Sequence, residues 1–318
     1  MSNQNNFVVL GAGVIGLSTA LTLRSKFPTT PISVLAKHFP GDYSVEYCSP
    51  WAGGNWCSSA NDNGLLESFD RLTFERFKEI ASKHPEAGIQ PSPLRMIFDQ
   101  KIEESEILSQ GTGRVWLLGK CQAEKIATIQ AAVDSVDDAF ISSSTTAVFN
   151  CTGLSSYSLG GVNDKSLYPT RGQTVLVEQP IQPLQRMYFR SPRRVDNDTT
   201  YVFQRPLAGG IVLGGCREDG NWNGEVDMDF AQDIMRKCCA LAPELGKPED
   251  LKIIKHGVGL RPGRKGGPRI EAEARSKGLV IHNYGAAGAG YQASWGMANA
   301  VSLLTEALEG RKRASSKL

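Results

Sequence analysis

A glycine-rich turn near the start of the chain limits the possible folds more than any other feature. The apolar run 7–10 (FVVL) leads into residues 11–16 (GAGVIG), and Leu17, Ala20 and Leu21 continue with helical spacing. A second apolar run at 32–35 (ISVL) completes a βαβ unit of ordinary length. We therefore expect a parallel sheet.

The glycine spacing of this turn predicts a dinucleotide site. Gly11 permits a tight turn, Gly13 lets a pyrophosphate approach the backbone, and Gly16 brings helix and strand together. The N–H groups at the start of the helix would bind the phosphates. The predicted contacts are Gly11, Ala12, Gly13, Val14, Ile15 and Gly16, and the motif alone leaves FAD and NAD open.

The end of the second strand departs from the simple NAD pattern. Leu35 is followed by Ala36, Lys37 and His38, with no acidic residue to hold the ribose. Lys37 could pair with phosphate or lie beside adenine. The alternative is that Lys37 and His38 belong to a solvated loop.

Composition excludes several classes of function. A formal charge of +2 spread over 318 residues does not form a nucleic-acid-binding surface. No apolar run reaches the roughly 20 residues that a membrane span needs. Seven cysteines and four histidines lack metal-ligand spacing, so we expect no metal site.

The second half of the chain predicts an antiparallel sheet. Runs 201–203 and 211–213 are apolar and separated by the turn 206–210 (PLAGG), which indicates a hairpin. A helix is expected over 230–241, ending before Pro243. Residues 40–64 are too rich in Gly, Pro, Asn and Ser for regular structure, and a loop this long is usually functional.

A second glycine-rich turn, 283–291 (NYGAAGAGY), lies between a predicted strand at 279–282 and a predicted final helix. Two such turns can hold both ends of a long dinucleotide, and the second helix start can stabilise negative charge on a reduced flavin. This favours FAD over NAD.

At this segment the chain resembles a known family. Residues 280–298 (VIHNYGAAGAGYQASWGMA) are similar to the signature of D-amino-acid oxidases and D-aspartate oxidases. Further similar segments follow in the family's order: SPWAGGNW at 49–56, FNCTGL at 149–154, YPTRGQ at 168–173, GGCREDGNW at 214–222 and GVGLRP at 257–262.

The resemblance implies an α/β fold in which a Rossmann-like, FAD-binding parallel sheet is interleaved with an antiparallel, β-rich substrate domain. The expected FAD-binding domain comprises 1–80, 145–175 and 255–310, and the substrate domain 81–144 and 176–254. It implies further flavin contacts from Lys37, His38, Ser49, Gly53, Asn55, Gly285, Gly288, Gly290, Tyr291 and Gln292.

The resemblance also implies the reaction, in which a D-amino acid and oxygen yield a 2-oxo acid, ammonia and hydrogen peroxide. Arg261 matches the arginine that holds the substrate carboxylate, a role suited to a planar guanidinium. Tyr201 matches a tyrosine whose hydroxyl contacts the same carboxylate. The resemblance also implies that Gly288, in the signature segment, belongs to the catalytic site.

Arg217 occupies a position that helps to form the side-chain pocket in this family, where D-aspartate oxidases resemble this chain in having arginine. It is therefore predicted to bind a distal substrate carboxylate. The open alternative is that Arg217 turns outward and pairs with Glu218 or Asp219, at little gain in stability.

One departure from the family is a shorter connection between Ile80 and Phe149, where strands of the substrate domain are expected. Two alternatives stay open: a D-aspartate-preferring oxidase, which Arg217 favours, and an inactive flavin-binding remnant caused by the shortening. A homodimer is also left open.

The tail 311–318 ends in Ser316-Lys317-Leu318, the tripeptide that a peroxisomal import receptor recognises. We expect location in the peroxisome, where hydrogen-peroxide-producing oxidases are found.

Overall fold

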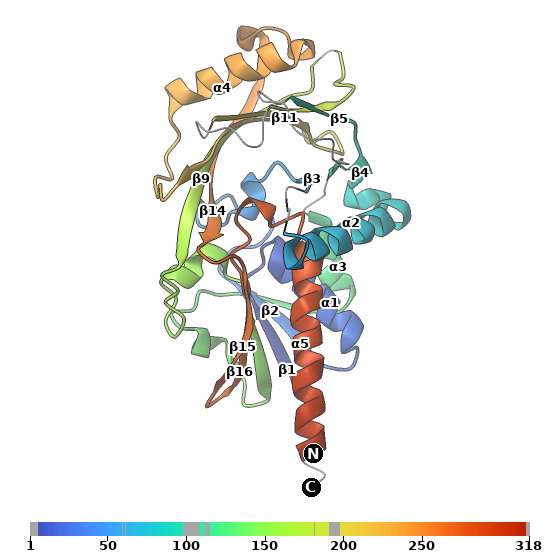
Figure 1. The fold of residues 1–318 in the computed structure, drawn as a ribbon, viewed down its shortest axis with the longest axis vertical. Helices are drawn as coiled ribbons and strands as arrows, with labels where there is room; N and C mark the ends of the chain where they lie inside the picture. The colour runs from blue at the N-terminus through green and yellow to red at the C-terminus, as the bar shows by residue number, and fades with distance from the viewer. Residues whose placement is uncertain are drawn as a thin grey trace.

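The computed structural model describes residues 6–58, 60, 62–97, 109–111, 115–180, 182–190 and 198–315. Two large sheets dominate the molecule (Figure 1), which confirms the predicted α/β class. Within the described residues, no helix combines the length and apolar character needed to cross a bilayer. The tripeptide Ser316–Leu318 lies outside the described residues.

The first sheet has the order β15-β16-β8-β1-β2-β7 and is parallel except at the β15–β16 pair. Along β1, Phe7 and Val9 face one core and Val8 faces another, as the two-residue period of a strand requires. Both faces of the strand are buried, which explains its continuous apolar run. The strands are β1 (Asn6–Leu10), β2 (Ile32–Ala36), β7 (Ala127–Gln130), β8 (Thr145–Asn150), β15 (Arg269–Arg275) and β16 (Gly278–Tyr284).

Four helices pack beside this sheet, and Figure 1 shows the long α5 running along its side. The close approach of α2 to α5 depends on Gly296, where an added Cβ would lie 2.2 Å from the Cα of Phe69. The helices are α1 (Val14–Lys26), α2 (Leu65–Lys83), α3 (Val115–Ala123) and α5 (Ser294–Ser315).

The second sheet has the order β13-β9-β12-β11-β10-β5, with β14 also paired to β9. Its pairs are antiparallel except β10–β5, and helix α4 (Met228–Leu241) covers one face (Figure 1). The strands are β5 (Leu94–Ile97), β9 (Leu167–Val177), β10 (Met187–Arg190), β11 (Asp198–Gln204), β12 (Ile211–Cys216), β13 (Glu218–Asp219) and β14 (Ile253–Arg264).

Alternation along β11 decides what faces the interior of the molecule. Val202 packs in the cluster under α4, whereas Tyr201 and Phe203 lie in the cluster on the opposite face. The sheet therefore presents aromatic side chains on the face that α4 leaves uncovered.

Sheet membership differs from the expected domain division in three places. Strand β7, expected in the substrate domain, pairs with β2 in the parallel sheet. Strands β9 and β14, whose motifs were grouped with the FAD-binding domain, form an eleven-residue antiparallel pairing in the second sheet. A long strand can begin in one expected domain and pair with strands of the other, and the sequence pattern of the strand itself does not show this. The domain boundaries themselves stay a prediction.

The loop 40–64 was expected to lack regular structure, and this was wrong in part. It contains a 3-10 turn (Ser49–Trp51) and the short strand β3 (Asn55–Cys57). This strand joins β4 (Gln90–Pro91) and β6 (Ser109–Gly111) in a small third sheet. Pairing with distant segments supplies the hydrogen bonds that the local composition did not predict.

Candidate functional site

A cavity of about 1170 Å³ is lined by residues of both large sheets. It exceeds the range of about 300–1,000 Å³ that is usual for small-ligand pockets. Every predicted site residue except Gly16 lines it: Gly11, Ala12, Gly13, Val14, Ile15, Lys37, His38, Ser49, Gly53, Asn55, Tyr201, Arg217, Arg261, Gly285, Gly288, Gly290, Tyr291 and Gln292.

The first glycine turn is built by close backbone contacts. Gly11 has φ +108°, and an added Cβ there would lie 2.6 Å from the carbonyl oxygen of Cys151. A Cβ at Gly16 would lie 1.9 Å from the carbonyl oxygen of Gly11. Gly16 therefore lies beneath the turn and acts by close packing, whereas Gly11 and Gly13 face the cavity.

The start of α1 is suited to bind an anion. The helix has no acidic residue in its first turn, and its N-cap Gly13 has no side-chain capping bond. Val14 N donates to Ser49 Oγ at 3.0 Å, which leaves the Ser49 hydroxyl hydrogen for a further acceptor. These groups, with the glycine cradle, fit a dinucleotide pyrophosphate.

The end of β2 is occupied by an ion pair. Glu46 Oε2 lies 2.5 Å from Lys37 Nζ and 3.4 Å from His38 Nε2. These two neighbours lower the pKa of Glu46. Lys37 and His38 thus line the cavity, and both contact a carboxylate that the sequence did not indicate; their predicted flavin contacts stay a prediction.

The second glycine turn faces the cavity and is held by a buried carboxylate. Gln292 Nε2 and Ser58 Oγ both donate to Asp70 Oδ2, at 3.0 and 2.6 Å. Asp70 is only 3% exposed, and burial raises its pKa to about 6. Asp70 therefore connects α2 to two segments that line the cavity.

Aromatic side chains of the second sheet line the other end of the cavity. Tyr201 and Phe203 stack with ring centroids 4.7 Å apart, and Phe189 meets Tyr201 edge-on at 6.2 Å. A Cβ at Gly214 would lie 2.2 Å from Tyr201 Cζ, so the tyrosine ring lies directly against the β12 backbone. Burial raises the pKa of Tyr201, while the nearby Arg261 charge opposes that shift.

Arg261 lies between this aromatic wall and the second glycine turn. Its guanidinium covers Gly172, where an added Cβ would be 2.2 Å from Nη1, and its Cδ would be 3.8 Å from a Cβ at Gly288. Nη1 donates to the backbone carbonyls of Thr170 and Cys216, at 3.5 and 3.4 Å. No carboxylate in the described part of the chain forms an ion pair with Arg261, so its charge is available to a ligand.

Arg217 is exposed and lines the same cavity. The alternative pairing of Arg217 with Glu218 or Asp219 is not formed in this structure. Glu218 lies 3.5 Å from Arg171 and accepts a hydrogen bond from Asn221, and Asp219 accepts from Thr170 Oγ1 at 2.6 Å. Arg217 forms no hydrogen bond or ion pair with any described residue.

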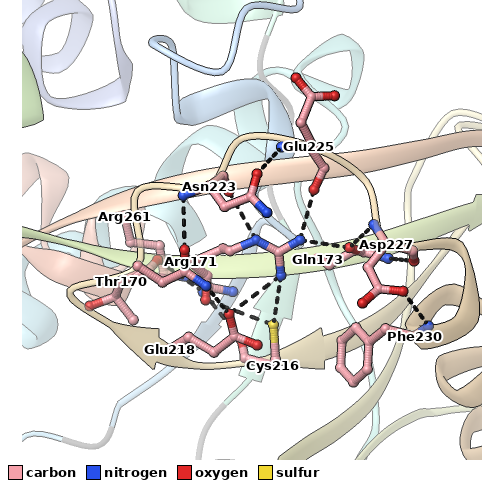
Figure 2. A network of polar contacts seen from close by, with 11 residues as sticks. Thr170, Arg171, Gln173, Cys216, Glu218, Asn223, Glu225, Asp227, Phe230 and Arg261 are labelled. Atoms are coloured by element: carbon pink, nitrogen blue, oxygen red, sulfur yellow. Dashed lines mark hydrogen bonds and ion pairs between the residues drawn. The ribbon is translucent and has the colours of Figure 1, made fainter.

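The segment that carries Arg217 is fixed from behind by Arg171, which is 4% exposed (Figure 2). Its guanidinium donates to the carbonyls of Asn223 and Glu225, at 2.9 and 2.8 Å, and to Gln173 Oε1 at 2.9 Å. Gln173 in turn accepts from Asp227 N at 2.9 Å. Residues of the YPTRGQ motif thus hold the loop between β12 and α4.

Sequence interpretation missed several residues at the cavity. Glu46, Phe189, Phe203 and Cys216 line it, and Asp70 supports it from behind. Glu46 lies in an irregular loop without a motif, and Asp70 lies on an amphipathic helix among other acids. Only the alternation of aromatic residues around Tyr201 could have indicated Phe203.

Comparison with known proteins places the chain in a family. Residues 113–304 match the model of the DAO family, described as FAD dependent oxidoreductase. A D-amino-acid oxidase of Schizosaccharomyces pombe is 37% identical over 346 aligned positions, covering 94% of this chain and 96% of the relative. A D-aspartate oxidase of Talaromyces thermophilus is 28% identical, covering 96% of each chain.

The 346 aligned positions exceed the 318 residues of this chain, so the yeast relative carries residues that this chain lacks. In fold, a glycine oxidase structure from Bacillus cereus is similar with a TM-score of 0.71 at 16% identity, covering 95% of each chain. The predicted family and the predicted cofactor are confirmed: this chain belongs to the DAO family of FAD-dependent oxidoreductases.

Proposed function

We propose that this chain oxidises D-amino acids and that Arg261 binds their carboxylate. The observation that carries the proposal is the Arg261 guanidinium, which lies beside Tyr201 in the cavity that both glycine turns line and has no carboxylate partner among the described residues. The name of the 37% identical yeast relative supports the same substrate class.

The side chains at this end suit the binding of an amino acid. Arg261 can form two parallel charge-assisted hydrogen bonds to the carboxylate. Because the pKa of Tyr201 is raised, its hydroxyl stays protonated near neutral pH and can donate a third. Phe189 and Phe203 form an apolar wall beside these donors.

FAD would be held by the two glycine turns and would supply the oxidising chemistry, taking up two electrons as hydride from the α-carbon, with oxygen as the final electron acceptor. The protein's part is to hold the substrate in one orientation, with its carboxylate on Arg261. The resulting imine leaves the cavity and hydrolyses in water to a 2-oxo acid and ammonia. No protein base is needed for this sequence of steps.

Oxygen uptake by the purified protein tests this function. With FAD bound, D-alanine should support oxygen consumption and release of a 2-oxo acid, whereas L-alanine should support neither. A colourless protein, or equal rates with both enantiomers, would contradict the proposal. Protein that holds flavin but consumes no oxygen with either enantiomer would instead favour the inactive flavin-binding remnant.

A preference for acidic substrates is the second candidate, and Arg217 favours it. This guanidinium lines the cavity and its acidic neighbours are engaged elsewhere. A distal carboxylate would give it a partner. A higher kcat/KM for D-aspartate than for D-alanine would support this candidate, and no measurable turnover of D-aspartate would exclude it.

We also propose that Ser316-Lys317-Leu318 directs the chain to the peroxisome, where hydrogen peroxide is removed. A fluorescent protein fused ahead of the chain should collect in peroxisomes, and deletion of the three residues should disperse it. Unchanged location after deletion would contradict this role.

A further inference from the structure

Dinucleotide folds usually carry an acidic residue just after the second strand, where it binds the adenosine ribose. In this chain β2 ends at Ala36 and is followed by Lys37 and His38. Both side chains are cations when protonated, and neither can supply a carboxylate oxygen to the ribose. This end of the cavity therefore lacks the expected carboxylate at the expected position in the sequence.

The structure supplies a carboxylate at that place from a later loop. Glu46 lines the same cavity as Ala36 and the first glycine turn, with Oε2 2.5 Å from Lys37 Nζ. The loop is fixed next to it, because Tyr47 donates its hydroxyl to the Ala12 carbonyl at 2.7 Å. A residue nine positions further along is thus held at the end of β2.

Only one oxygen of this carboxylate is engaged. Lys37 and His38 both contact Oε2, whereas Oε1 forms no hydrogen bond with any described residue. Lys37 and His38 favour the ionised form of Glu46. Oε1 is therefore an acceptor that no described residue occupies, on a side chain that lines the cavity together with Ala36 and the glycine turn.

We infer that Glu46 binds the adenosine ribose hydroxyls of FAD in place of an acid at position 37. Lys37 and His38 act as positioning residues that hold Oε2 and leave Oε1 for the ribose. Because Glu46 neutralises Lys37, this end of the cavity does not suit a ribose that carries a phosphate, and it selects an unmodified adenosine.

A plain surface ion pair is the competing explanation for these contacts. Lys37 and Glu46 are both more than half exposed at their side chains, and such pairs contribute about 0–1 kcal/mol to stability. That role would alter neither flavin affinity nor the preference between flavins. The two explanations therefore differ in binding, which can be measured without any substrate.

Binding of FAD and FMN to the full-length apoprotein by calorimetry tests the inference. Glu46→Gln should weaken FAD binding about 10- to 100-fold, the range expected for a charge-assisted hydrogen bond. FMN lacks the adenosine, so its dissociation constant should not change. The matched control Glu75→Gln, which removes an exposed glutamate that pairs with Lys78 on α2, should change neither.

A second variant separates Glu46 from Lys37. Lys37→Met should weaken FAD binding only a few-fold, because the carboxylate remains. Unchanged FAD binding in Glu46→Gln, an equal loss for FAD and FMN, or a larger loss in Lys37→Met than in Glu46→Gln would each overturn the inference. None of these outcomes depends on which amino acid the protein oxidises.

Discussion

The two ends of the cavity are built in different ways. At the first glycine turn, backbone atoms of β1, α1 and the β8 end approach so closely that an added Cβ would lie 1.9–2.6 Å from a carbonyl oxygen at Gly16 and Gly11. At the Tyr201 end, side chains from separate strands meet, and Arg261 and Arg217 supply charge. The first end requires glycines, which have no Cβ atom, whereas the other end requires particular charged and aromatic side chains.

This difference predicts different responses to substitution. At the backbone end, even a methyl group must displace main chain, so stability and FAD binding should fall together. At the side-chain end, removal of a group leaves the strands paired, so substrate kinetics should change while FAD stays bound. The following variants separate these responses, from the largest expected effect to the smallest.

Arg261→Ala should reduce kcat/KM for D-alanine about 10²- to 10⁴-fold. Two charge-assisted hydrogen bonds to the carboxylate, at about 1.5–3 kcal/mol each, would be lost. Steady-state oxygen uptake measures this. Arg236→Ala, which removes an exposed arginine from α4, is the matched control and should keep wild-type kinetics. Ordinary turnover in Arg261→Ala would remove this residue from the site.

Gly16→Ala should lower the free energy of unfolding by about 3 kcal/mol, the upper end for overpacking, and weaken FAD binding as well. Urea unfolding of the apoprotein measures the first effect. Gly119→Ala on α3 is a suitable control, because nothing lies within 4 Å of an added Cβ and alanine favours a helix by up to about 1 kcal/mol. Equal stabilities of the two variants would refute the close-packing role of Gly16.

Arg217→Leu should lower the ratio of kcat/KM for D-aspartate over D-alanine about 10- to 100-fold, as expected for loss of one charge-assisted bond. The FAD dissociation constant should stay at the wild-type value. Arg217→Lys, which keeps the charge, should show a smaller change. An unchanged ratio in Arg217→Leu would mean that this side chain does not contact the substrate.

Asp70→Asn should make the protein more stable than wild type above pH 6, by about 1–2 kcal/mol. Burial raises the folded-state pKa of Asp70 to about 6, so the wild type loses stability as pH rises from about 4 to 6 and the carboxyl ionises. One asparagine oxygen can accept both bonds that Asp70 Oδ2 accepts.

Unfolding free energies at pH 4 to 8 would show the effect as a slope that is present in the wild type and reduced in the variant. The acidic neighbours Asp62 and Glu67 add to the same shift. Parallel pH profiles of the two proteins would contradict the account of Asp70.

The backbone end of the cavity could be predicted from sequence because its determinants are contiguous. Gly11, Gly13 and Gly16 lie within six residues, and they directly follow the continuous apolar run of residues 7–10. The predicted hairpin around residues 206–210 was also correct, since β11 and β12 pair directly. The resemblance added Arg261 and Tyr201, which neither spacing nor composition could have selected.

What could not be predicted depends on contacts between distant segments. Glu46 reaches the end of β2 only because Tyr47 binds the glycine turn, 35 residues earlier in the chain. Arg171 holds a loop more than 50 residues away, and strand β7 joins β2 across some 90 residues. Such contacts carry no local signal in a single sequence.

The absorbance of bound flavin during anaerobic mixing with D-alanine tests the central claim most directly. The wild type should lose its oxidised flavin absorbance, and Arg261→Ala should retain both the bound flavin and its oxidised spectrum at the same substrate concentration. A wild type that is not reduced, or a variant that is reduced at the wild-type rate or has lost its flavin, would contradict the account of one cavity with separate cofactor and substrate ends.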